Sequence, residues 1–186
     1  WDEKSIKIVE VAERIQDAGA KAITIHGRTR AQMYKGFADW TPIAEVKNNP
    51  RMNIPVFGNG DVNSPEKAVE MRDKYGLDGA MIGRASIGNP WFFNHVKHYF
   101  KTAKHLPYPM INERIEMARR HLEMSIKWKG EKLGVLETRR HYSNYFKGIP
   151  DFKKHRTKMV TCDYSAQLFD LFDELKVRFK NKELAY

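Results

Sequence analysis

The chain has 186 residues, of which 41% are hydrophobic, 30% are charged and 12% are aromatic, and its formal net charge is +10. This composition excludes a disordered tail, the lack of a run of about 18 apolar residues excludes a transmembrane helix, and the first residues do not resemble a signal peptide. The single cysteine, Cys162, excludes a disulfide framework and a cysteine-rich zinc site. We therefore expect a cytoplasmic protein with no metal site, and the basic excess favours a polyanionic partner, nucleic acid first.

The first hundred residues alternate between helical and strand patterns. Apolar residues recur at helical spacing over residues 5–18, where Ser5 is the expected cap and Gly19 ends the helix. Two further helices are predicted at 41–48 and at about 64–75, because each opens with a proline at its first helical position. The apolar residues of the first helix are Ile6, Val9, Ile15 and Ala18. Short β-rich runs predict strands at 21–25, 54–57 and 79–82.

The predicted strands are continuously apolar, which is typical of parallel strands that helices bury on both faces. Polar and glycine-rich residues follow the strands directly. In barrels of alternating strands and helices, this carboxyl edge is where the chemistry takes place. The sequence therefore predicts an α/β fold for residues 1–108, with a parallel sheet and helices outside it.

Residues 109–186 carry no strand pattern and predict a small helical bundle that follows the Pro107-Tyr108-Pro109 stretch. Two helices have clear apolar stripes, and two shorter helices are expected between them, at about 131–146 and 150–160. The first stripe comprises Ile111, Ile115, Ala118, Leu122 and Ile126, and the second comprises Tyr164, Leu168, Leu171, Leu175 and Phe179.

The basic excess of this bundle lies in one stretch, residues 139–158, which holds seven Lys and Arg residues and one acidic residue, Asp151. Basic side chains neutralise nucleic-acid phosphates, whereas the interleaved aromatic residues can either stack on bases or pack in the core. We favour nucleic-acid binding over a solvated helix face, because the charge elsewhere in the bundle cancels. The interleaved residues are His141, Tyr142, Tyr145 and Phe146.

Glycine-rich sequences follow two consecutive strands, as Gly58-Asn59-Gly60-Asp61 and Gly83-Arg84. Such junctions let backbone N–H groups approach an anion, and Arg84 adds a charged donor. The pair therefore predicts a phosphate site. His26 ends the first strand, and the loop after it is long for a strand–helix connection, which favours a functional role.

Several motifs occur together and in a familiar order. They are His26-Gly27-Arg28-Thr29-Arg30 with Gln32, Tyr34, Gly36 and Ala38-Asp39-Trp40, then Gly58-Asn59-Gly60-Asp61, Gly83-Arg84 and Asn89-Pro90-Trp91, and finally Arg140-His141 with Tyr145, Lys147-Gly148-Ile149-Pro150 and Arg156. Together they resemble the signature of the tRNA-dihydrouridine synthase (Dus) family, over nearly the whole chain.

The resemblance implies a flavin-bearing TIM barrel followed by a helical tRNA-binding domain. The family reduces the C5–C6 bond of uridines in tRNA with FMN, which NADPH recharges. By position, His26 is expected beside the isoalloxazine ring, Asn59, Gly60 and Asp61 near the ribityl and phosphate groups, and Gly83 and Arg84 at the phosphate. The expected RNA contacts are Arg28, Arg139, Arg140, His141, Lys153, Lys154 and Arg156.

The chain departs from the family in its number of strands, because a TIM barrel needs eight strand–helix units and about 250 residues. We therefore expect a partial barrel of about three units over residues 1–108, with the helical domain at 109–186. The catalytic cysteine of the family would lie upstream, and Cys162 is expected to be a packing residue. We expect this chain to be inactive alone and to self-associate through exposed strand edges.

Two other functions remain open. Another FMN-dependent barrel acting on a small ring substrate would share the phosphate loops but lack a basic helical tail. A non-catalytic RNA-binding module would use the helical domain alone, and its RNA binding would weaken steeply with salt.

Overall fold

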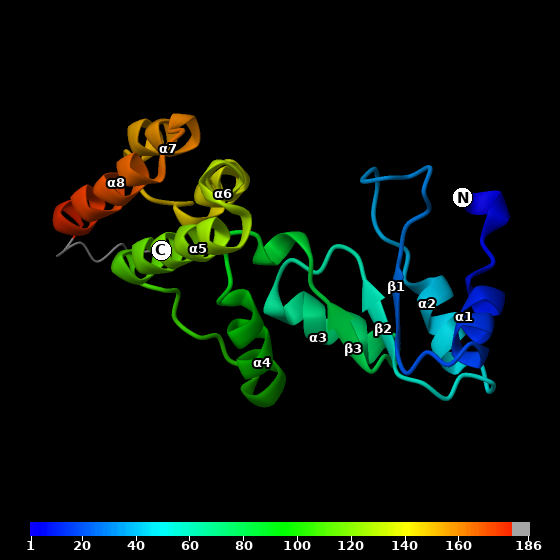
Figure 1. The fold of residues 1–186 in the computed structure, drawn as a ribbon. Helices are drawn as coiled ribbons and strands as arrows, with labels where there is room; N and C mark the ends of the chain where they lie inside the picture. Colours follow the sequence, from blue (N-terminus) through cyan, green and yellow to red (C-terminus); the bar gives the residue numbers. More distant parts are fainter. Residues whose placement is uncertain (180–186) are drawn as a thin grey trace. The chain divides into compact units, whose positions relative to one another are not determined.

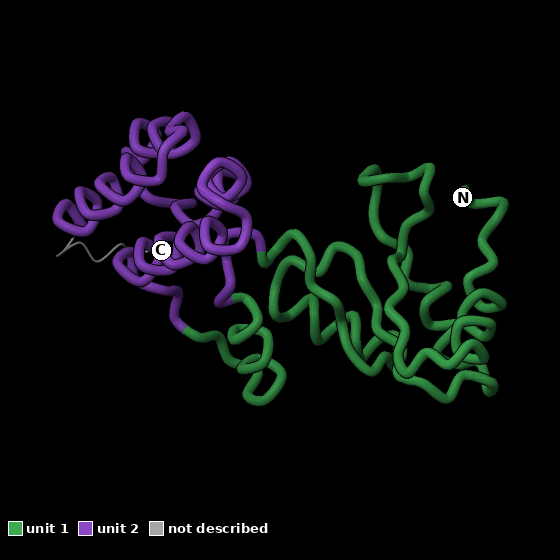
Figure 2. The backbone as a smooth tube through the Cα atoms, viewed as in Figure 1, with its two compact units in different colours: residues 1–86, 92–106 green, residues 87–91, 107–186 purple. Residues whose placement is uncertain are grey.

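Three parallel strands form the centre of the first part of the chain in the computed structural model, which describes residues 1–179 (Figure 1). The described chain divides into two compact units, residues 1–86 with 92–106, and residues 87–91 with 107 onward (Figure 2). The last residues of the predicted bundle, 180–186, lie outside the described part. No helix within residues 1–179 is long and apolar enough to cross a bilayer.

The sheet of the first unit has the order β1-β2-β3 and a regular alternation of strand and helix. Its strands are β1 (Ile23–His26), β2 (Val56–Asn59) and β3 (Gly79–Met81). The helices are α1 (Ile8–Asp17), α2 (Thr41–Asn48), α3 (Pro65–Lys74) and α4 (Phe92–Thr102), and short 3₁₀ turns occupy η1 (Glu3–Ser5) and η2 (Arg84–Ser86). The prolines predicted to open α2 and α3 do so, and Ser64 caps α3 by accepting the N–H of Lys67 at 3.1 Å. This arrangement is compatible with part of a TIM barrel.

The prediction that both faces of the strands are buried is wrong for this structure. Ile23 and Ile25 of β1 are buried, whereas Thr24 and His26, which alternate with them, are exposed. The core of the unit lies between the buried strand face and apolar residues of α1, α2, α3 and α4. Helices therefore cover one face of the sheet, and the opposite face presents its side chains outward.

The start of the chain also differs from prediction. Ser5 does not cap the first helix, because its hydroxyl accepts the N–H of Asp2 at 2.9 Å in the η1 turn. Ala12 of α1 is fully buried. Ile6, which precedes the helix, is 49% exposed, and Ile15 is 40% exposed. The predicted apolar stripe is thus only partly used in this core. The first and second strands each begin two residues later than predicted, and α4 carried no prediction.

The second unit is the helical bundle that the sequence predicts. Its helices are α5 (Ile111–Lys129), α6 (Glu131–Tyr145), α7 (Lys153–Thr161) and α8 (Ser165–Arg178). The two predicted apolar stripes form most of the core of α5 and α8, except that Tyr164 is 65% exposed. Buried Arg114 of α5 donates to the carbonyl oxygens of Tyr145 and Lys147 at 2.5 and 2.8 Å, which satisfies carbonyl groups at and just beyond the end of α6.

Candidate functional site

The parallel register aligns the carboxyl ends of the three strands, where most of the predicted cofactor residues lie. His26 pairs in register with Asn59, and Asn59 with Met81. The Asn59 amide donates to the Met81 carbonyl oxygen at 2.8 Å, and His26 Nδ1 lies 3.2 Å from the carbonyl oxygen of Asn59. Cross-strand contacts therefore hold the polar side chains of this edge in place.

Asp61 organises the loops beyond this edge. Its carboxylate accepts two hydrogen bonds from Arg28, at 2.7 and 2.9 Å, one from Arg84 at 2.9 Å and one from the Ala38 N–H at 2.7 Å. Burial of the carboxyl group opposes ionisation, but the Ala38 and Arg28 hydrogen bonds and the two positive charges outweigh it. The pKa of Asp61 therefore lies below its ordinary value.

The long loop after β1 is shaped by Arg28. The guanidinium also donates to the Gly36 carbonyl oxygen at 2.8 Å, and the side chain is only 3% exposed. Its Nε and Nη1 atoms are buried without a hydrogen-bond partner. This geometry supports a role in holding the loop, and the RNA contact expected for Arg28 stays a prediction.

The two candidate phosphate glycines lie in different surroundings. Gly60 has a φ of +131°, and a Cβ atom there would come within 2.5 Å of the Ala38 side chain, so loop packing alone accounts for this glycine. Apart from its two chain neighbours, no atom of the described residues lies within 4 Å of the corresponding position at Gly83, which leaves its backbone open to a ligand. The neighbouring Arg84 side chain is 60% exposed and lies over the ring of Tyr34, at 5.1 Å.

The residues at this edge fit the phosphate of a flavin nucleotide. Two arginines surround one carboxylate, so the group of Arg28, Asp61 and Arg84 keeps one net positive charge. A guanidinium carries five N–H donors, and the contact of Arg84 with Asp61 leaves donors for an anion. Asp61 itself is saturated with protein donors, which favours a role in orienting the arginines.

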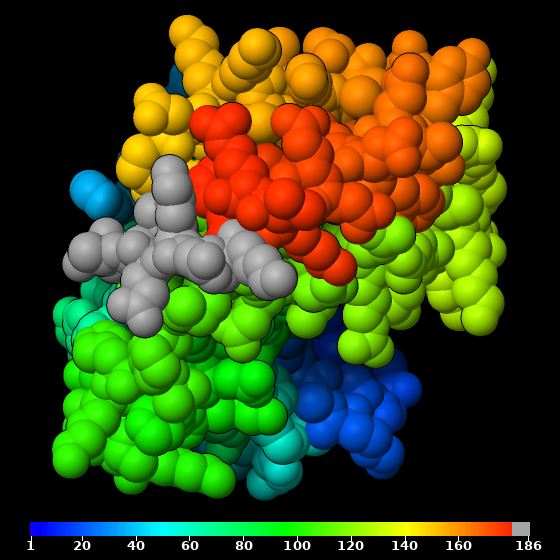
Figure 3. Space-filling view, turned by 90° about the vertical axis from the view of Figure 1, so that its left-hand side faces the viewer, coloured from blue at the N-terminus to red at the C-terminus, as the bar shows by residue number. Residues whose placement is uncertain are grey.

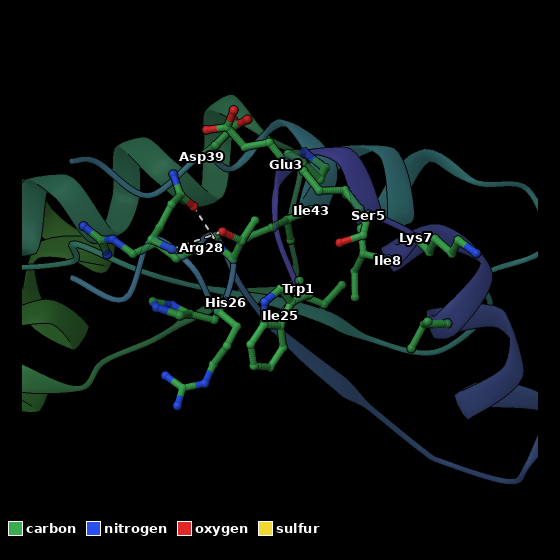
Figure 4. Close-up of a pocket in the computed structure, with 17 residues that line it drawn as sticks. Trp1, Glu3, Ser5, Lys7, Ile8, Ile25, His26, Arg28, Asp39 and Ile43 are labelled. Carbon is green, nitrogen blue, oxygen red and sulfur yellow. Dashed lines mark hydrogen bonds between the residues drawn. The ribbon is translucent and has the colours of Figure 1, made fainter. Parts of the chain in front are cut away.

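A cavity of about 420 Å³ lies beside β1, between the first residues of the chain and α2 (Figure 4). His26 and Arg28 line it, together with Trp1 and Ile43. Asn59, Asp61 and Arg84 do not, so this cavity does not unite the predicted cofactor residues. Within residues 1–179 no group of three or more His, Cys, Asp or Glu side chains could hold a metal ion.

The basic stretch of the helical unit divides into exposed and engaged residues. Lys153 and Lys154 are exposed on α7, which lies beside α8 at one surface of this unit (Figure 3, orange and red). Arg139 instead donates to Asp163 and to the Cys162 carbonyl oxygen, both at 2.6 Å. Arg156 is half-buried, and its Nε has no partner.

The aromatic residues interleaved with this stretch belong to the core. Tyr142 and Phe146 are fully buried, and Tyr145 is 3% exposed. The possibility that they stack on bases is therefore wrong for this structure, because their spacing follows the buried face of α6. Cys162 is partly buried and packs against the same core, as predicted.

His141 and Arg140 lie next to each other on α6. Arg140 is exposed, and its Nε is 3.2 Å from His141 Nε2. His141 Nδ1 accepts the N–H of Gly88 at 3.2 Å, and its ring meets that of His121 edge-on at 4.5 Å. Neither Gly88 nor His121 was predicted as a site residue. A glycine directly before the Asn89-Pro90 motif was the only signal for this contact.

Comparison with known proteins agrees with these features. The family model described as dihydrouridine synthase (Dus) matches residues 1–180. The chain belongs to the dihydrouridine synthase family. The match spans both units, and thus both the strand edge around Asp61 and the basic helix α7.

Curated relatives carry the same family name. The chain is 39% identical over 174 residues to a "Probable tRNA-dihydrouridine synthase 1" of Synechocystis, which covers 94% of this chain and 48% of that protein. It is 38% identical over 158 residues to "tRNA-dihydrouridine synthase B" of Pseudomonas putida, which covers 85% of this chain and 46% of that protein. A "Probable tRNA-dihydrouridine synthase" of Rickettsia conorii is 37% identical over 84% of this chain and 46% of its own length. The chain thus spans about half the length of these Dus relatives.

Proposed function

We propose that this chain is the part of a tRNA-dihydrouridine synthase that supplies a flavin phosphate site and an RNA-binding helical unit. The complete enzyme would reduce uridine to 5,6-dihydrouridine in tRNA, as the names of the relatives suggest. When bound, FMN supplies the hydride for the C5–C6 bond and is recharged by NADPH. The observation that carries the proposal is the family match over both units.

In this proposal the residues at the strand edge bind and orient the cofactor. The open backbone at Gly83 and the exposed guanidinium of Arg84 hold the phosphate, while Asn59, Gly60 and Asp61 shape the adjoining loop. Asp61 keeps Arg28 and Arg84 in place through its ion pairs. His26 would lie beside the flavin ring.

Protonation of the uracil ring needs a donor that we do not assign within this chain. The sole cysteine, Cys162, packs against the core of the helical unit and does not lie at the strand edge. We therefore propose that the chain alone does not turn over uridine. Turnover by the purified chain at the rate of a complete synthase would contradict this.

The helical unit is proposed to bind tRNA through its basic residues. Of the expected contacts, Lys153, Lys154 and Arg140 are exposed. Arg139, His141 and Arg156 are engaged or half-buried, so they are weaker candidates for direct phosphate contacts. An oxidoreductase of small rings has no need of such a surface.

Binding of unmodified tRNA tests this proposal. The double substitution Lys153→Gln with Lys154→Gln should weaken binding. It should also make the salt dependence shallower, because the magnitude of the negative slope of log K against log salt should fall by about 1 to 2. The matched control is Lys101→Gln with Lys104→Gln, which removes the same charge from exposed positions at the end of α4 and after it. Equal effects of both pairs would mean that net charge, rather than α7, determines binding.

Flavin retention tests the other half of the proposal. After addition of FMN and removal of the excess, the visible absorption spectrum of the chain should show bound flavin, and Arg84→Gln should lower retention. A chain that binds tRNA with the predicted salt dependence but shows no interaction with FMN would instead act as an RNA-binding module.

A further inference from the structure

An exposed tryptophan lies at the turn that joins α5 to α6 in the helical unit. Trp128 belongs to the last turn of α5, two residues before Gly130, and it is 80% exposed. Among the described residues, no aromatic ring stacks on the indole and no cation lies over it. Burial of an aromatic side chain is strongly favourable, so an indole left in water is a candidate contact for a ligand.

Trp128 is not an isolated exposed apolar residue. Met124 lies four residues earlier, on the same face of α5, and is 51% exposed. Leu133 lies in the first turn of α6, just beyond Gly130, and is 53% exposed. Single exposed apolar residues are common on soluble proteins, whereas apolar residues gathered near one turn of the chain favour a binding surface.

The same turn is basic. Residues 127–133 hold three lysines and one acidic residue, Glu131, which gives a net charge of +2. The Glu131 carboxylate accepts the N–H and the hydroxyl of Ser165, at 3.0 and 2.7 Å. Lys129 forms an ion pair with Glu137 of α6. The charge that remains for a ligand is therefore that of the other two lysines.

These two lysines, Lys127 and Lys132, are exposed and form no ion pair with another residue of the described part of the chain. A cation in the last turn of a helix is favoured by the helix dipole, which accounts for Lys127 at the end of α5. Lys132 lies in the first turn of α6, where the dipole disfavours a cation. Helix stability therefore does not explain Lys132, whereas an anionic ligand at this turn does.

The ligand has to combine a flat apolar face with negative charge. An unpaired nucleotide does so, because its base stacks on an aromatic side chain while the adjoining phosphates attract lysines. A second copy of this chain fits less well, since it has a net charge of +10 and would bring two basic turns together. The surface around Trp128 thus favours single-stranded RNA.

We propose that Trp128, Lys127 and Lys132 form an RNA contact, in which the indole stacks on an unpaired base and the lysines bind neighbouring phosphates. The inference rests on the proposed function, in which the helical unit binds RNA through α7. Lys153 and Lys154 of α7 supply charge alone, whereas Trp128 makes binding depend on unpaired bases.

Two variants of the full chain separate stacking from apolarity. Trp128→Phe keeps an aromatic ring, and Trp128→Leu keeps an apolar side chain without a ring. Both should fold like the wild type, because the position is 80% exposed. The matched control is Tyr164→Leu, which removes another exposed ring of the same unit, 65% exposed at the start of α8.

The first readout is the affinity for a short single-stranded oligouridylate, compared with inorganic polyphosphate, which has the charge without the bases. Trp128→Leu should weaken oligouridylate binding about fivefold, as for the loss of one stacked base, whereas Trp128→Phe and Tyr164→Leu should change it less than about twofold. Polyphosphate binding should be the same in all variants. Equal oligouridylate affinities of Trp128→Leu and the wild type would overturn the inference.

The second readout is tryptophan fluorescence, which stacking on a base quenches. Oligouridylate should quench part of the emission of the wild type, and this part should be missing in Trp128→Phe. Polyphosphate should not quench it. Quenching of equal size in the wild type and in Trp128→Phe would contradict stacking on Trp128.

Binding of unmodified tRNA separates this inference from the proposed function. If the wild type binds neither tRNA nor oligouridylate, RNA binding by the helical unit fails, and the contact at Trp128 fails with it. If the Lys153 and Lys154 substitutions weaken tRNA binding but Trp128→Leu does not, α7 binds RNA and the inference about Trp128 is wrong. Reduced self-association of Trp128→Leu in sedimentation, with unchanged RNA binding, would identify the turn as an interface between copies and would also overturn the inference.

Discussion

Asp61 is the single residue on which the candidate site depends most. It is the counterion of the buried Arg28 and of the exposed Arg84, and it also accepts the Ala38 N–H. Its φ of +55° places the carboxylate in an αL turn, which an aspartate tolerates better than most residues. The carboxylate thus couples the loop after β1 to the turn after β3.

Asp61→Asn should therefore destabilise the protein. The substitution keeps the shape of the side chain but leaves the 3%-exposed Arg28 without its counterion, so we expect a loss of about 3 kcal/mol in the free energy of unfolding. Asp163→Asn is the control, because Asp163 is 74% exposed in its pair with Arg139 and should cost less than about 1 kcal/mol. Urea unfolding measures both losses. Similar losses would mean that the Arg28–Asp61 pair stabilises the protein no more than the Arg139–Asp163 pair does.

Two glycines at the strand edge should respond differently to alanine. A Cβ atom at Gly58 would lie 2.6 Å from Trp40 Cε3 and 2.8 Å from Leu77 Cδ1, both in the core, whereas the position at Gly83 is open. Gly58→Ala should lower the free energy of unfolding by about 1 to 3 kcal/mol, and Gly83→Ala should leave it nearly unchanged. Equal unfolding midpoints in urea for these two variants would contradict the packing around Trp40.

At the scale of elements, α5 and α6 meet through two half-buried histidines. The pKa of His141 is lowered to about 4, and that of His121 is lowered as well, with burial as the first cause of both shifts. The folded protein therefore disfavours protonation of both rings, while the unfolded chain protonates them near pH 6.5.

The sign of the resulting pH dependence follows from linkage. Between pH 6.5 and pH 4 the unfolded chain binds more protons at His141 than the folded chain does, so the stability that this ring contributes above pH 6.5 declines as the pH falls. We expect the free energy of unfolding to fall more steeply in the wild type than in His141→Asn over this range. Parallel curves from urea unfolding at several pH values would show that His141 titrates normally in the folded state.

At the scale of the whole molecule, the sheet of the first unit has two edge strands and an exposed face. β1 and β3 are the edge strands, and Thr24 and His26 face outward from β1. Ile6, Val11 and Ile15 are 40 to 49% exposed near the start of the same unit. Unpaired strand edges and exposed apolar side chains favour association with another chain.

We therefore predict that the isolated chain self-associates. Its average mass in sedimentation velocity should rise with concentration, and Thr24→Lys should reduce this rise, because a lysine on an edge strand opposes pairing. Thr24→Val keeps the size of the side chain without the charge and serves as the control. A constant monomer mass for the wild type at high concentration would overturn this prediction.

Most helices and all three strands could be predicted from the sequence, because they depend on local patterns. The prolines before α2 and α3, the glycine after α1 and the stripes of α5 and α8 each act within a few residues of the element they define. The family motifs and the basic stretch are also contiguous. These motifs predict membership of the dihydrouridine synthase family, and the comparisons confirm this prediction.

The contacts between distant residues could not be predicted in this way. Arg28 and Arg84 meet Asp61 across 33 and 23 residues, and Gly88 meets His141 across 53. Burial likewise depends on which elements pack together. For this reason the sequence pattern could not show that Tyr142 and Phe146 lie in the core whereas Lys153 lies at the surface. The sequence by itself thus determined the elements, the charge and the family. Only the tertiary structure decided which arginine is buried, which is exposed and which backbone His141 holds, because these depend on chain folding that brings separate segments together.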